Sequence, residues 1–135
     1  MDPLNASSQT PTAAPAVLPL SQKLAAFDAE RAAIRRNELD YEVTCNILGL
    51  PAAEHTVDPD AVRVCSADTN VLAAWFFEKG GRVTRSELPH GVTVWTLDTN
   101  AGADEGHVGC RVLVTLVAPS SAWIQHEIRD AAVAA

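Results

Sequence analysis

The stretch from Ala73 to Thr99, AAWFFEKGGRVTRSELPHGVTVWTLDT, constrains the fold most, because it changes from helical to strand periodicity within a few residues. Asp68 is suited to cap a helix over TNVLAAWFFEK, residues 69–79, which has a broad apolar face. The pair Gly80-Gly81 supplies the left-handed conformation that ends many helices. The sequence therefore predicts a buried helix that leads directly into a sheet.

The segment after these glycines predicts a β-hairpin. RVTRSEL and VTVWTLDT flank the turn Pro89-His90-Gly91, in which proline presets φ and glycine frees the backbone. A polar loop, NAGADEGH, then leads to a further strand, VGCRVLVTLVA, which Pro119 ends. Ahead of the helix, AVRVC at residues 61–65 predicts another short strand.

The two ends of the chain differ in character. Residues 1–19 are rich in Pro, Ala and Ser, bury too little to offset ordering, and predict a disordered tail. A single domain over 20–135 follows, since this length builds one core. Its first helix starts near Leu20 with Ser21 as N-cap and carries an apolar stripe of Leu24, Phe27 and Ile34.

The C-terminal segment predicts one more helix, and the segment between Pro51 and Pro59 predicts a loop. Ser120 or Ser121 is suited to cap that last helix. Its apolar side chains would be Trp123, Ile124, Ile128 and Ala131.

The segment from Tyr41 to Ile47 fits two structures. Apolar residues alternate with polar ones in YEVTCNI, which indicates a half-buried strand. Tyr41, Cys45 and Leu48 would equally continue a helix that stops at Gly49. The content of β-branched residues favours the strand slightly. The expected fold is α+β, with three to five mainly antiparallel strands and two or three helices, in the order (helix, strand?), strand, helix, strand, strand, strand, helix.

The strand after the polar loop is apolar on both sides. Cys110, Val112, Val114 and Leu116 would share one face, and Leu113 and Val117 the other. A sheet with one solvated face normally shows a clean alternation of apolar and polar residues. Something is therefore expected to cover the second face, either the N-terminal helix or another subunit.

Charge and composition exclude several classes of function. A net charge of −7 and a pI near 4.9 disfavour nucleic-acid binding through phosphate contacts. We expect no membrane association, since no apolar run approaches the length of a spanning helix. The N-terminus lacks the positive region of a secretory signal, so the expected compartment is the cytoplasm. The three cysteines, Cys45, Cys65 and Cys110, are then expected to be reduced and mostly buried.

The sequence predicts no catalytic, cofactor-binding or metal-ligating residue. It has no GxxxxGK[ST], GxGxxG, GxSxG or HExxH motif. His107 and Cys110 would supply two metal ligands where zinc needs at least three from protein. The loop DTNAGADE departs from a calcium loop, because Ala103 replaces its glycine and Gly109 its closing glutamate. His55 and His90 lie in expected loops and are interpreted as surface residues.

These observations favour a non-enzymatic protein-interaction module, an assembly, structural or regulatory accessory protein that binds a protein partner or forms a homo-oligomer. The binding element would be the sheet face, the expected edge strand RVTRSEL or the N-terminal tail. The abundance of Ala and Arg suits a phage or mobile element of a high-GC bacterium. The expected interacting residues are Arg82, Arg85, Glu87, Trp95 and Leu97. The alternative is a small-molecule-binding domain or small enzyme with a pocket between helix and sheet, lined by Trp75 and Trp95.

Overall fold

A computed structural model describes residues 19–102 and 108–135 of the chain. The chain divides into two compact units, residues 1–30 and residues 31–135. The prediction of a disordered tail falls almost wholly on residues 1–18, which lie outside the described residues. His107 and the end of the DTNAGADE loop, residues 103–105, lie outside them as well. The fold described below is that of residues 31–135.

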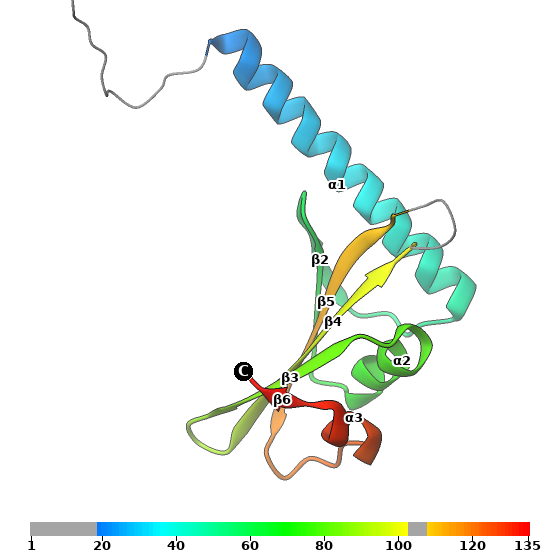
Figure 1. The fold of residues 1–135 in the computed structure, drawn as a ribbon, viewed down its shortest axis with the longest axis vertical. Coiled ribbons are helices and arrows are strands. Elements are labelled where there is room, and N and C mark those ends of the chain that lie inside the picture. Colours follow the sequence, from blue (N-terminus) through cyan, green and yellow to red (C-terminus); the bar gives the residue numbers. More distant parts are fainter. Residues whose placement is uncertain (1–18, 103–107) are drawn as a thin grey trace, which may run out of the picture. The chain divides into compact units, whose positions relative to one another are not determined.

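This unit is α+β, as the sequence predicts, with a six-stranded sheet in the order β1-β2-β5-β4-β3-β6 (Figure 1). The strands β2 and β5 pair in parallel, as do β3 and β6, and the other pairs are antiparallel. The strands are β1 (Glu54–Val57), β2 (Val62–Ser66), β3 (Arg82–Leu88), β4 (Val92–Ala101), β5 (Cys110–Pro119) and β6 (Val133–Ala134).

The helices of this unit lie on one side of the sheet (Figure 1). They are α2 (Thr69–Lys79), α3 (His126–Ala131) and the part of α1 (Leu20–Leu48) that follows Glu30. Helix α2 has the predicted ends: the Asp68 carboxylate accepts a hydrogen bond from the Asn70 amide at 2.9 Å, and Gly80 follows with a φ of 68°. None of the described helices is long and apolar enough to cross a membrane.

The core lies between these helices and β2, β4 and β5. In the register of β4 and β5, Trp95 lies opposite Leu116 and Leu97 opposite Val114, and all four are buried. Trp75 of α2 is fully buried against this layer. Because strand side chains alternate, the same register directs Val94, Thr96 and Val117 to the opposite face.

The strand that the sequence slightly favours over residues 41–47 is wrong, and the helical alternative is correct. Tyr41, Asn37 and Thr44 share one buried face of α1. The Asn37 amide donates hydrogen bonds to the carbonyls of Asp58 and Pro59, each at 3.0 Å. At Gly49 φ is 65°, which ends the helix as predicted. Long-range packing thus decides a segment whose local pattern fits both periods.

Three further predictions need correction. Strand β1 lies inside the predicted 51–59 loop, and β6 was not predicted, so the sheet has six strands and not three to five. Helix α3 begins only at His126, with Gln125 at the N-cap and no side-chain cap, so neither Ser120 nor Ser121 caps it. Trp123 and Ile124 precede the helix, and the Ser120 hydroxyl is instead hydrogen-bonded to Thr93 at 2.8 Å. Helix α1 begins at Leu20 as predicted, but Ser21 lies inside the helix and is not its N-cap; the Pro19 carbonyl accepts from the amides of residues 22 and 23.

Gly81 provides a test of the close approach between β3 and β4. A Cβ at Gly81 would lie against the carbonyl oxygen of Asp98, and its φ is 127°, whereas a Cβ at Gly80 meets nothing nearby. We expect Gly80→Ala to cost only backbone strain, about 1–3 kcal/mol, and Gly81→Ala to cost about 2 kcal/mol more because strand backbones must shift. Urea unfolding of both variants measures the difference; equal losses would contradict this packing.

Candidate functional site

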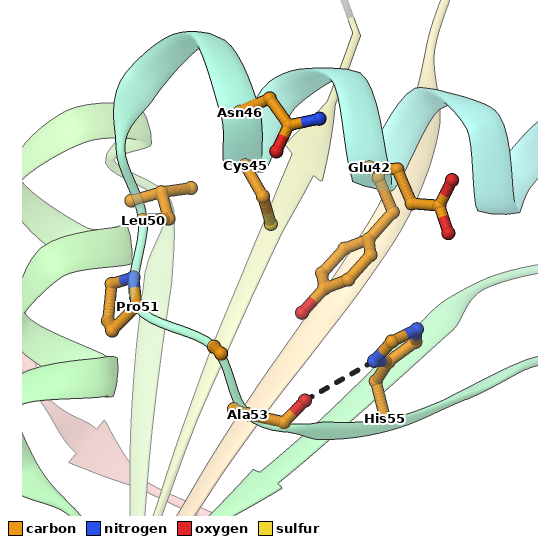
Figure 2. Close-up of a pocket in the computed structure, with 9 residues that line it drawn as sticks. Glu42, Cys45, Asn46, Leu50, Pro51, Ala53 and His55 are labelled. Atoms are coloured by element: carbon orange, nitrogen blue, oxygen red, sulfur yellow. Dashed lines mark hydrogen bonds between the residues drawn. The ribbon is translucent and has the colours of Figure 1, made fainter.

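A pocket lies between the C-terminal part of α1 and strand β1 (Figure 2). Its volume is about 360 Å³. We call it the α1–β1 pocket. The figure shows α1 carrying Glu42, Cys45 and Asn46 above the chain that runs from Leu50 to His55. Its lining residues are Tyr41, Glu42, Cys45, Asn46, Leu50, Pro51, Ala52, Ala53 and His55.

Aromatic contacts fix the inner wall of this pocket. The ring of Tyr41 stacks on that of Trp75 with centroids 5.8 Å apart and planes 10° apart. Its other neighbour is the His55 imidazole, 4.4 Å away and tilted by 40°. Nδ1 of His55 lies 3.3 Å from the carbonyl oxygen of Ala53. Because Tyr41 is only 4% exposed, the wall is part of the core and is preformed.

The ionisable groups of the pocket are poorly suited to nucleophilic chemistry. Burial raises the pKa of the Tyr41 phenol, and the Cys45 side chain beside it adds to the effect. Burial also raises the pKa of the Cys45 thiol, which is therefore protonated near neutral pH. Within residues 19–102 and 108–135, no three His, Cys, Asp or Glu side chains are grouped so as to hold a metal ion.

The second feature is the sheet face opposite the helices, which we call the open face. No helix of residues 31–135, so far as these are described, lies over it (Figure 1). Its centre is formed by partly exposed β-branched and aliphatic side chains from three strands, and Val117 is 41% exposed. These residues are Thr84, Val94, Thr96, Leu113, Thr115 and Val117.

Charged groups mark one end of the open face. The Arg111 guanidinium donates two hydrogen bonds to the Asp98 carboxylate, at 2.7 and 3.0 Å. These bonds lower the pKa of Asp98, and the charge of Arg82 acts in the same direction. With Glu54, Arg63 and the ion-pair partner of Arg63, Asp58, the charged side chains of this face are three arginines and three acids. The open face is therefore not acidic, although the whole chain has a net charge of −7.

The structure separates the five residues that the sequence predicts as interacting. Arg82 is exposed on the open face. Arg85 and Glu87 lie on the helix-covered side, 3.5 Å apart, and the Arg85 guanidinium lies 5.6 Å from the centre of the Trp95 ring. Trp95 is 4% exposed and Leu97 is fully buried, so neither side chain reaches a partner on the folded chain.

Three related predictions are also corrected. Strand β3 is not the outermost strand, because β6 pairs with it at Thr84 and Arg85. Trp75 and Trp95 do not line the α1–β1 pocket, although Trp75 supports its wall from behind. His55 is on a strand rather than in a loop.

The residues that form the pocket are not predicted as site residues from the sequence. Glu42 and Cys45 belong to the segment whose pattern fits both helix and strand, and His55 belongs to an expected loop. The usable signal was the helical alternative, which places Tyr41, Glu42 and Cys45 on neighbouring positions of one helix surface. No sequence signal brings His55 to them, since its place depends on β1 pairing with β2.

Comparisons with known proteins give no relative. No family model, no curated protein and no solved structure matches the chain.

The cysteines allow a direct test of the described burial. Cys65 is exposed, Cys45 partly buried and Cys110 buried, so the expectation that the thiols are mostly buried does not hold for Cys65. Burial raises the pKa of Cys110 to about 11, which leaves roughly one thiolate in a thousand near pH 8. In a native disulfide-exchange assay we expect one fast thiol, lost in Cys65→Ser. A fast Cys110 would contradict this arrangement.

Proposed function

We propose that the protein is a non-enzymatic protein-interaction module that assembles through the open face of its sheet. The observation that carries the proposal is the uneven cover of the sheet: helices bury one face, whereas Val94, Leu113 and Val117 remain partly exposed on the other. A sheet face with exposed apolar side chains and no covering helix is a candidate association site, and the arginines at one end of it are a residue type enriched in protein interfaces.

The sequence leads us to expect that either the N-terminal helix or another subunit covers this face. The part of α1 from Arg31 to Leu48 packs on the other side, as shown by the stacking of Tyr41 on Trp75. The Cys110 thiol, on the covered face of β5, donates to the Asn37 carbonyl at 3.6 Å, which places α1 there too. Residues 31–48 of α1 therefore do not cover the open face, and another subunit is the other covering that the sequence leads us to expect.

A second copy of the chain is the occupant that charge favours. Two acidic chains repel over most of their surfaces, but the open face carries both signs, with Arg82, Arg111 and Asp98 at one end. A two-fold axis brings identical patches together, and such a patch must contain both members of each contact pair. The central Val94–Val117 cross-strand pair would then pack against its own equivalent.

The test uses Val94→Glu and Val117→Glu, each of which places a charge at the centre of the proposed interface. Phe77→Glu is the control, since Phe77 is 55% exposed on α2, away from the open face. We expect light scattering to give a concentration-dependent dimer for the native chain and for Phe77→Glu. Each open-face variant should weaken the dimer at least about tenfold, as loss of a central contact does.

A native chain that stays monomeric at all concentrations would contradict assembly with a second copy. Equal dimerisation of all three variants would move the interface away from the open face. Urea unfolding of each variant confirms that a lost dimer is not a lost fold.

A small-molecule-binding domain or small enzyme is the second candidate, and the α1–β1 pocket is the observation that favours it. The pocket is preformed by Tyr41 and carries Glu42 and His55 as polar groups. A metabolite should raise the melting temperature of the native chain, but not that of a variant in which a larger side chain at Ala53 fills the pocket. That result would support this candidate.

A further inference from the structure

The outer edge of β1 is the starting point, since β1 is the outermost strand of the sheet and pairs only with β2. The amide of Asp58 donates to the carbonyl of Ala61 at 2.8 Å, where the β1–β2 hairpin turns. Antiparallel residues alternate between exchanging hydrogen bonds with the partner strand and directing them away from it. The alternation therefore leaves the N–H and C=O of His55 and Val57 directed outward, without a backbone partner among the described residues.

Hollows flank β1 on both faces of the sheet. The α1–β1 pocket lies on the covered side, where His55 points. A second, open hollow of about 630 Å³ is lined by six residues, of which four belong to the opposite face. These four are Glu54, Thr56, Arg63 and Cys65, and the other two are Ala53 and His55. Successive side chains of a strand point to opposite faces, so a strand added to this edge needs a space on each side. The edge of β1 has both.

The charged side chains beside β1 determine which kind of peptide strand would bind there. Glu42 on α1 and Glu54 on β1 flank the edge, and neither belongs to an ion pair in the described part of the chain. Arg63, the one arginine lining the open hollow, is held by Asp58 at 2.7 Å. The local field is therefore negative and favours a basic ligand. Residues 1–18 of the chain contain no Lys or Arg and do not meet this requirement.

We propose that an extended basic segment of another protein binds along the outer edge of β1 as an additional strand. Its backbone exchanges hydrogen bonds with His55 and Val57, and a medium-sized apolar side chain enters the α1–β1 pocket beside Glu42 (Figure 2). Flanking Lys or Arg side chains meet Glu42 and Glu54. This site goes beyond the proposed assembly: it lies at the β1 edge, away from the Val94–Val117 centre of the proposed interface, although Glu54 belongs to the same sheet face.

Synthetic peptides test the proposal on the native chain. The probe is a peptide of about eight residues that alternates Lys and Val, long enough to cover β1 and its ends. Its controls are the Glu-Val counterpart, the same Lys-Val peptide N-methylated on alternate amides, and residues 1–18. By fluorescence anisotropy we expect the Lys-Val peptide to bind at least about tenfold more tightly than each control, since charge and backbone hydrogen bonds are both required.

Variants locate the site. His55→Pro removes the outward N–H without touching the bonds that Glu54 and Thr56 make to β2, whereas His55→Ala keeps that N–H. We expect the proline variant to bind about tenfold more weakly than the alanine variant. The double variant Glu42→Lys/Glu54→Lys should prefer the Glu-Val peptide, and Val94→Glu should bind as the native chain does.

Several results would overturn the proposal. Equal binding of the N-methylated peptide, which needs no variant, would show that no strand is added. Equal binding of acidic and basic peptides, preference for residues 1–18, or no binding of any peptide would each reject the basic partner. Because Val94→Glu reports on the open face alone, failure here and failure of the proposed assembly are told apart.

Discussion

Burial of one face of the β4–β5 pair is the constraint on which the rest of the structure depends. Trp95 and Leu97 face Leu116 and Val114 across the two central strands, and Trp75 of α2 closes over this layer. Burying these side chains supplies much of the apolar area removed from water. Since strand side chains alternate, the same burial directs Val94 and Val117 outward, so the open face is a consequence of the core.

The core also creates the α1–β1 pocket. Trp75 stacks on Tyr41, and this contact holds α1 beside β1, with His55 packed on the other side of the tyrosine. A helix and the outermost strand of the sheet thereby form the walls of one groove. Removing the stacking would leave the edge of β1 without its helical wall, which connects the stability of the core to the proposed peptide site.

Local patterns predicted the elements whose signals are local. The Asp68 cap, the paired glycines and the Pro89-Gly91 turn correctly placed α2, β3 and β4. The pattern does not choose between helix and strand for residues 41–47, because long-range contacts decide it: Tyr41 stacks on Trp75, and the Asn37 amide donates to the Asp58 and Pro59 carbonyls. Strand β1 is not predicted, because apolar and polar side chains alternate only weakly over its four residues and because its pairing partner is β2.

The candidate sites show the same division. Apolar residues occur on both faces of β4, so the sequence alone could not tell that Trp95 and Leu97 point inward while Val94 points outward. Which alternate residues of β4 face the core is determined only by α2, which covers one face of the sheet. The pairing of β1 with β2 places His55 in the same pocket as Glu42 and Cys45, and no sequence motif predicts that pairing. The sequence therefore shows which residue types the strands contain, but not which face of the sheet each side chain occupies.

The most direct measurement of the central claim, that a second subunit covers the open face, is methyl NMR with a soluble paramagnetic probe at low and high protein concentration. The account predicts that the methyl signals of Val94 and Val117 are strongly broadened in dilute protein and become shielded as the concentration rises. Those of Leu97 and Val114 should stay shielded throughout. Valine signals of the open face that remain equally accessible at every concentration would contradict the account.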